Sequence, residues 1–278
     1  MLRTAKRHQQ QTAAIAQRAV REARKGSPGA AVVRHQAAAA LTATAAVSAM
    51  LAEQGTPVAA EAALVPLAFT ADPVVVDKMA AELDSWRFDQ LIASLVTDAA
   101  RAAESVTITT RPGVYGFVRA VSTPCCSRCA ILAGRVYRWD ADFQRHPNCD
   151  CSELPTKYPD SEFKTNPYEL VEGGHVTGLS KADMRAYNDG ADLNQLVNAK
   201  RGGLRRVNFG PGRTVSITSE GMTSRGIAGQ RLGDLRKVDG ERYRRSGQMR
   251  LTLDSIYKAA NGDRETALRL LKRNGYIV

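Results

Sequence analysis

Aromatic residues are scarce in this sequence, and long hydrophobic runs are missing from it. Phe, Trp and Tyr make up 6% of the 278 residues, whereas 44% are hydrophobic and many of these are alanine. Small side chains bury little apolar area each, so the composition predicts extended helices rather than one thick core. The least charged run, residues 35–52, is too weakly hydrophobic for a membrane span. No continuous apolar run follows the basic N-terminus as in a secretory signal, and we expect a soluble protein made in a reducing cytoplasm.

Acidic residues are also few. The chain has 28 of them against 39 Lys and Arg, which gives a formal net charge of +11. Most of this excess lies in residues 200–250, where there are thirteen basic and four acidic residues. Such a segment favours an acidic partner, usually nucleic acid, although a basic face in contact with solvent alone is the alternative. The candidate nucleic-acid-binding residues are Arg205, Arg206, Arg213, Arg225, Arg244 and Arg245.

No coherent set of catalytic residues is recognisable. The glycines of NFGPGRT and SEGMTSRGIAG do not fit a P-loop, which needs Gly-Lys-Ser/Thr at a set spacing, and we interpret them as turns. His8, His35 and His175 lie in sequence contexts that do not suit a hydrolytic metal site. We therefore expect no catalytic residues and no enzymatic activity.

Residues 1–105 have the character of a helical, Ala-rich N-terminal region. Good helix formers fill residues 2–25, and a second helix is expected over about residues 30–53. Thr56-Pro57 and Asp72-Pro73 each have a residue pair that can open a helix. Residues 84–104 form a further helix candidate, because their apolar side chains recur at helical spacing. The buried face predicted there consists of Phe88, Leu91, Ile92, Leu95, Val96 and Ala99.

The composition changes at residue 106. Thr, Val and Ile replace Ala, which predicts a compact module with short strands over residues 106–157. An irregular basic region follows over residues 158–251. It has one helix, at residues 180–199 with Ser180 as its N-cap, and a possible strand at residues 214–218.

The chain closes with a pair of short helices in residues 252–278. LDSIYKAA follows Thr252 and RETALRLLKR follows Asp263, and both preceding residues are plausible N-caps. Asn274-Gly275 ends the second helix.

All five cysteines and one histidine lie within a single stretch, CCSRCAILAGRVYRWDADFQRHPNCDC, at residues 125–151. Structural zinc takes four Cys or His ligands in a tetrahedron, usually as two pairs from tight turns. The Cys-x-x-Cys spacing lets two sulfurs meet one ion, and the histidine with one of the last two cysteines would complete the set. The candidate metal ligands are Cys126, Cys129, His146, Cys149 and Cys151, and the expected cofactor is structural Zn²⁺.

Other cysteine chemistries fit this stretch less well. A disulfide framework requires an oxidising compartment, and the number of cysteines is odd. A thioredoxin-like pair should follow a strand in a βαβ setting, and a catalytic nucleophile needs only one cysteine. Redox pairing and cysteines that fill a small core stay open as alternatives. The predicted fold class is mainly α with a small α+β zinc-stabilised module.

The residues between the cysteines make the pattern more specific. In GFVRAVSTPCCSRCAILAGRVYRWDADFQRHPNCDCSELP, a Gly-aromatic-Val-Arg strand precedes Cys-x-x-Cys and Leu-Ala-Gly, and Tyr-x-Trp precedes Arg-His-Pro-x-Cys-Asp-Cys and a Pro. This pattern resembles the MuF-like minor head proteins of tailed bacteriophages, in the form common in phages and prophages of actinobacteria. SEGMTSRGIAG and the closing LTLDSIYKAANGDRETALRLLKRNGYIV resemble two further elements of that family. The resemblance runs in pieces from about Asp98 to the C-terminus, and Cys125 is extra to it.

The resemblance implies a structural virion protein, a minor capsid protein, rather than a metabolic enzyme. Members of the family are associated with capsid assembly and with DNA packaging or delivery, and they lie inside the head near the portal. The implied partners are the portal and other head proteins, with packaged double-stranded DNA as a further one and no membrane. Synthesis in the host cytoplasm would precede incorporation into the head interior. The alternative is a zinc-containing DNA-binding protein, or an HNH-like nuclease, that acts in the cell.

Overall fold

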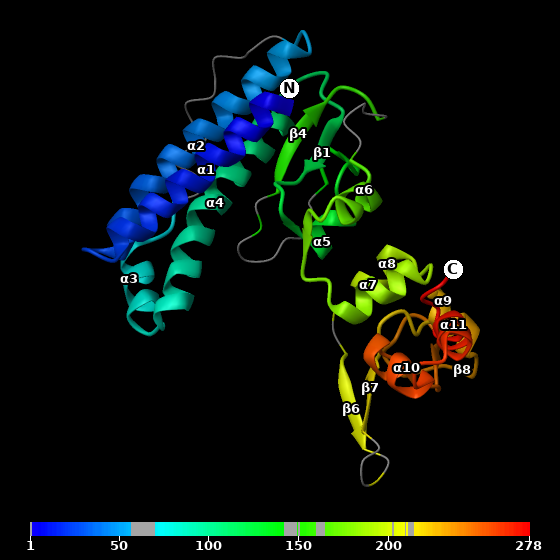
Figure 1. The fold of residues 1–278 in the computed structure, drawn as a ribbon. Coiled ribbons are helices and arrows are strands. Elements are labelled where there is room, and N and C mark those ends of the chain that lie inside the picture. Colours follow the sequence, from blue (N-terminus) through cyan, green and yellow to red (C-terminus); the bar gives the residue numbers. More distant parts are fainter. Residues whose placement is uncertain are drawn as a thin grey trace. The chain divides into compact units, whose positions relative to one another are not determined.

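Helices predominate over short strands in the computed structural model, which describes residues 2–56, 70–141, 149, 151–159, 165–201, 203–208, 210 and 214–278 (Figure 1). The predicted combination of many helices with small sheets is thus present. By their contacts the residues form two compact units, Met1–Cys125 with Leu132–His175, and Cys126–Ile131 with Val176–Val278. Among the described residues, no helix combines the length and the apolar character needed to cross a bilayer.

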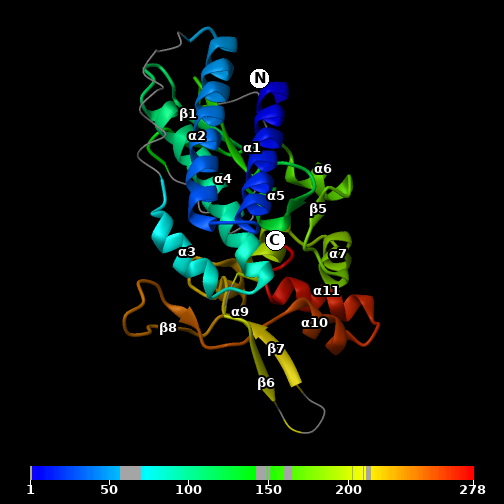
Figure 2. The ribbon, with the colours of Figure 1, turned by 90° about the vertical axis from the view of Figure 1, so that its left-hand side faces the viewer.

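Three long helices build much of the first unit, and they run side by side in Figures 1 and 2. Their common core consists mainly of alanine, with a few valine and isoleucine side chains such as Val32, Ile92 and Val96. Small side chains let helices approach closely, which explains how a sequence poor in aromatics forms a core here. The helices of this part are α1 (Leu2–Ala23), α2 (Pro28–Glu53), α3 (Pro73–Ala81) and α4 (Ser85–Thr109).

Local signals in the sequence set the starts of these helices. Ser27 accepts a hydrogen bond from the N–H of Ala30 at the start of α2, and Asp72 caps α3 in the same way. In both helices proline occupies the first position, where its missing N–H costs nothing. The predicted opening at Asp72-Pro73 is confirmed, whereas the helix expected after Thr56 lies in residues 57–69, outside the described residues.

Helix α4 is longer than predicted. The strand character expected from Val106 onward is wrong for residues 106–109, which continue the helix. Thr107 and Ile108 are buried there, and the hydroxyl of Thr107 donates to the carbonyl of Ala103 at 2.6 Å. Burial of this helix face outweighs the weak intrinsic preference of β-branched residues for strands.

A small antiparallel sheet follows α4 in the first unit. Its strands are in the order β3-β1-β4, and Phe117 of the central strand stands opposite Tyr137 and Pro155. A Cβ on Gly116 would lie 1.8 Å from the carbonyl oxygen of Tyr137, so this position requires glycine. The elements are β1 (Gly116–Ala120), β3 (Val136–Arg138), β4 (Ser152–Thr156) and helix α6 (Pro167–Glu172).

The second unit combines short helices with small sheets. Its largest sheet has the order β10-β7-β6, and the two closing helices are present as predicted. Two-stranded sheets pair β2 (Cys125–Cys126) with β5 and β8 with β9. The elements are α5 (Ser127–Ala130), β5 (Val176–Thr177), α7 (Lys181–Asn188), α8 (Leu193–Asn198), β6 (Arg205–Asn208), β7 (Thr214–Thr218), α9 (Ile227–Leu232), β8 (Leu235–Arg236), β9 (Arg245–Ser246), β10 (Arg250–Leu251), α10 (Leu253–Ala260) and α11 (Arg264–Arg273).

For this unit, the sequence predicted the start of helices and one strand correctly, but it did not predict a break within a helix. Ser180 and Asp263 are N-caps as predicted, and the strand at residues 214–218 is confirmed. The single helix expected over residues 180–199 is wrong, because the chain forms α7 and α8 instead. Gly190 separates them with φ +91°, a left-handed conformation that ends α7.

Tyr276 is a central core residue of the second unit. Its ring is fully buried, and its hydroxyl donates a hydrogen bond to the carbonyl of Leu251 at 3.0 Å. Burial raises the pKa of this phenol from its ordinary 10.0 to about 12. The folded state therefore holds the proton more tightly than the unfolded state, and the associated stability, complete below pH 10, is lost as the pH rises toward 12.

Tyr276→Phe is expected to reduce this alkaline loss of stability. The free energy of unfolding of the parent protein should fall between pH 10 and about 12, and the variant should show a smaller fall over the same interval. Urea titrations at each pH, followed by circular dichroism, measure the free energy of unfolding. Tyr158→Phe, which changes an exposed tyrosine, is the control and should behave as the parent does. An equal fall in the parent and in Tyr276→Phe would show that another group titrates.

Candidate metal centre

The first cysteine pair lies on a tight turn. Cys126 is the N-cap of the short helix α5, and its sulfur accepts a hydrogen bond from the N–H of Cys129 at 3.3 Å. Cys129 itself is buried within α5. The Cys-x-x-Cys spacing thus produces the compact turn expected from the sequence.

Three cysteines come together in space. The sulfurs of Cys129, Cys149 and Cys151 all lie within 4.8 Å of one another, and the three side chains are buried. In a tetrahedral site with zinc–sulfur bonds of about 2.3 Å, the sulfurs are about 3.8 Å apart, so a small inward adjustment would let all three bind one ion. The three cysteines can therefore hold a metal ion.

Buried arginines provide a cationic environment for these thiols. A terminal nitrogen of Arg119 in β1 lies 3.9 Å from the sulfur of Cys149, within hydrogen-bonding distance for sulfur. Arg101 of α4 donates from Nε to the carbonyl oxygen of Cys151 at 3.0 Å. The thiolate is the form of cysteine that binds metals. Arg101 also forms an ion pair with Asp98, with 3.1 Å between its terminal nitrogen and the carboxylate oxygen.

The arginines were not identified from the sequence. Arg119 is the arginine of the Gly-aromatic-Val-Arg strand, and Arg101 interrupts a run of alanines in α4. A charged residue within an otherwise apolar run is the signal that could have marked both. Their burial, at 2% and 6% exposed, shows only in the tertiary structure.

The other predicted ligands have different positions. Cys126 is half-buried and is not one of the three clustered cysteines, although it precedes Cys129 by one turn. His146 lies outside the described residues. Sequence reasoning left open which of Cys149 and Cys151 binds metal, and the structure brings both to Cys129. Cys125 is buried outside the cluster, and its N–H donates to the carbonyl of His175 at 2.9 Å.

The candidate nucleic-acid-binding arginines divide into exposed and engaged side chains. Arg205, Arg206 and Arg244 are exposed, and Arg225 is exposed while donating to the hydroxyl of Tyr243 at 2.8 Å. Arg245 is half-buried, with its guanidinium against the carboxylate of Glu241 and the carbonyl of Ser219. These contacts within the unit account for the position of the Arg245 side chain, and no bound ligand is needed to explain it. Arg213 lies outside the described residues.

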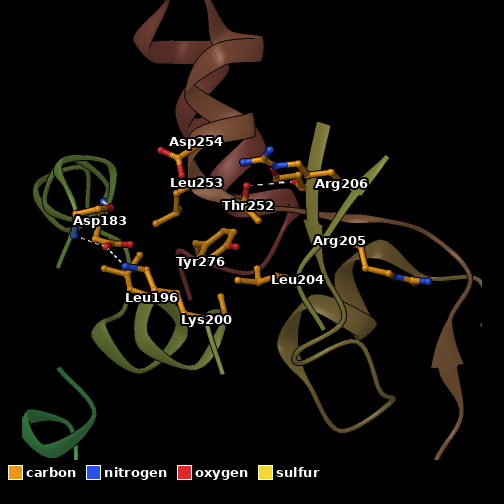
Figure 3. A pocket seen from close by; sticks show the side chains of 13 residues that line it. Asp183, Leu196, Lys200, Leu204, Arg205, Arg206, Thr252, Leu253, Asp254 and Tyr276 are labelled. Carbon is orange, nitrogen blue, oxygen red and sulfur yellow. Dashed lines mark hydrogen bonds and ion pairs between the residues drawn. The ribbon is translucent and has the colours of Figure 1, made fainter. Parts of the chain in front are cut away.

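A pocket of ≈ 430 Å³ lies beside the start of β6 in the second unit (Figure 3). Apolar side chains form part of its wall, and an ion pair between Lys200 and the buried Asp183 forms another part. Asp183 also accepts from the N–H of Ser180, so its charge is satisfied within the fold. The arginines of β6 lie at the same pocket, which makes its surroundings basic. The lining includes Leu196, Leu204, Arg205, Arg206, Leu253 and Tyr276.

Comparison of the chain with protein-family models, with curated proteins and with solved structures finds no match.

Proposed function

We propose that this chain is a minor head protein of a tailed bacteriophage, a structural virion component of the MuF-like type. The observation that supports the proposal is the cysteine segment at residues 125–151. Its cysteines and the residues between them follow that family's pattern, and three of the patterned cysteines meet in one buried cluster. With Cys126 or His146 as a fourth ligand, these three buried thiols would form a closed site suited to a role in folding, whereas a catalytic zinc site keeps one position open to water.

Zinc is the metal that we propose for the cluster. Thiolate ligands select zinc, copper(I) or iron–sulfur clusters, and zinc alone commonly combines three cysteines with either a fourth cysteine or a histidine. Cys126 and His146 are the two candidates for the fourth position. When bound, the ion would supply folding free energy and no reaction step.

Exposed apolar side chains support assembly with other proteins. Val74, Val75 and Met79 of α3 and Trp86 at the start of α4 are all exposed, although most aliphatic and aromatic side chains of this part are small or buried. Exposed apolar groups gathered in one region are typical of protein–protein contact surfaces. We propose the portal and other head proteins as the partners.

Two of the three described histidines of the first unit, His8 and His35, support a structural rather than an enzymatic role. His8 lies 2.5 Å from the carboxylate of Glu104, and both side chains are buried. His35 is also buried, with its Nδ1 at 2.8 Å from the carbonyl of Ala31. Both rings are engaged within the fold, whereas His175, the third described histidine of this unit, is exposed. An HNH-like nuclease, the second candidate, would have to use a histidine other than His8 and His35.

Mass spectrometry of purified particles tests the proposal. Particles made by the genome that encodes this chain should contain it in the head fraction, together with the portal protein. A host cytoplasmic enzyme measured in the same sample controls for contamination. Particles that lack the chain, although the producing cells contain it, would contradict a virion role and favour a protein that acts in the cell.

A further inference from the structure

The strands of the β6–β7 hairpin in the second unit carry basic residues and no acidic ones. β6 is the edge strand of the sheet β10-β7-β6, and the hairpin extends away from α10 and α11 in Figures 1 and 2. Residues 200–219 contain five basic residues and no acidic one. The two strands as the structure describes them carry Arg205 and Arg206 and no acidic residue, which creates a local positive potential.

The register of the hairpin sorts its side chains onto two faces. Arg206 stands opposite Ser216, and Asn208 stands opposite Thr214, so one face carries only hydrogen-bonding groups. The other face carries Arg205 opposite Ile217 and, next to this pair, two facing valines. The polar face is at least partly exposed at all four positions. It presents guanidinium, amide and hydroxyl donors without a carboxylate.

Acidic groups near the base of the ribbon do not cancel this charge. Asp183 is buried and paired with Lys200. Asp254, in the first turn of α10, is the exposed carboxylate at the pocket of Figure 3. Lys200 is already paired with Asp183, so Arg205 and Arg206 stand against Asp254 and leave the pocket rim positive by one charge.

We propose that the β6–β7 hairpin, with the rim of the adjoining pocket, binds the phosphate backbone of duplex DNA. The proposal rests on the proposed function, which places this chain beside packaged DNA. A two-stranded ribbon fits the major groove of B-DNA, which is about 12 Å wide. The planar guanidinium of arginine can donate two parallel hydrogen bonds to phosphate oxygens, and Ser, Thr and Asn side chains can donate further ones. We expect this binding to be independent of base sequence, because contacts to phosphate carry no sequence information.

Fluorescence anisotropy with a short labelled duplex tests the proposal on the full-length protein. Binding should be measurable at low salt and should weaken as salt rises, with a log–log slope of about −0.9 for each phosphate contacted. The double variant Arg205→Gln/Arg206→Gln should bind at least about fivefold more weakly and show a slope shallower by about 1, because Arg206 lies on the polar face and Arg205 on the opposite one. Unchanged circular dichroism and melting would show that the variant is folded.

The matched control is Arg269→Gln/Arg273→Gln, which removes the same charge from exposed positions of α11 in the same unit. Its affinity and salt slope should stay close to those of the parent. Equal losses in the two double variants, no binding of the duplex even at low salt, or preferential binding of a polyglutamate peptide would each overturn the proposal. A chain found in virions that binds no DNA would remove this inference and leave the proposed function standing.

Discussion

Replacement of Cys129, Cys149 or Cys151 by serine is expected to remove the bound metal and to unfold the small sheet around it. The parent protein should contain about one equivalent of zinc per chain. Each of the three sulfurs lies in the same buried cluster, so the loss of one leaves an incomplete metal site. Structural zinc contributes about 10 kcal/mol or more to the folding of small modules, which makes this the largest effect we expect.

Elemental analysis and thermal melting measure this effect. The double change Cys126→Ser/Cys129→Ser should likewise abolish zinc binding and partly unfold residues 110–155, while the circular dichroism of the long N-terminal helices persists. Cys125→Ser is the matched control, because Cys125 is also buried but lies outside the cluster. It should retain zinc. A metal-free protein with the melting behaviour of the parent would contradict a structural metal.

The single change Cys126→Ser separates the two candidates for the fourth ligand. Loss of zinc would assign the fourth position to Cys126, and full retention would assign it to His146. His146→Ala should then give the reciprocal result. X-ray absorption at the zinc edge distinguishes four sulfur ligands from three sulfurs and one nitrogen.

Arg250→Ala is expected to destabilise the second unit by about 4 kcal/mol, the second large effect. Arg250 is 1% exposed and donates to the carbonyls of Asn274 and Glu220 at 3.0 and 2.7 Å and to the side-chain oxygen of Gln195 at 3.3 Å. Its guanidinium also stacks on the ring of Tyr276, 4.4 Å from the centroid. Burial lowers the pKa of this guanidinium, and electrostatic attraction to Tyr276 and Glu220 offsets part of that effect.

The alanine variant would leave buried acceptors without donors and a cavity next to Tyr276. Arg250→Lys should recover only part of the lost stability. The lysine ammonium group lies on a flexible side chain and cannot make the three hydrogen bonds that the planar guanidinium makes. Urea unfolding followed by circular dichroism measures both. Arg244→Ala, at an exposed position of the same segment, is the control and should change stability by less than about 0.5 kcal/mol. A similarly small effect of Arg250→Ala would show that the buried hydrogen bonds of Arg250 contribute little to the free energy of unfolding.

Local features of this chain were predictable where neighbouring residues decide the conformation. Ser27-Pro28 and Asp72-Pro73 open helices because the cap and the proline act within one turn. Asp263 caps α11 for the same reason. By contrast, the end of α4 was misjudged, because burial of Thr107 and Ile108 against distant residues overrides their local preference for strands.

Some features of the candidate metal centre were likewise predictable from the sequence, and others were not. Residue type and spacing marked the cysteines of the segment as ligands, because the chemistry of a thiolate does not depend on the fold. The burial of Arg101 and Arg119 around them could not be read from spacing, since their positions depend on how α4 and β1 pack.

By itself, the sequence determined where most helices start, that the chain is rich in helix, and that its cysteines and basic residues are concentrated in two segments. These properties depend on residues within a few positions of one another. Only the tertiary structure decided which of the cysteines meet, that Arg245 and Arg250 serve the fold, and that Arg205 and Arg206 lie exposed on a projecting ribbon. Those outcomes depend on burial and on partners far apart in the chain, which no local pattern records.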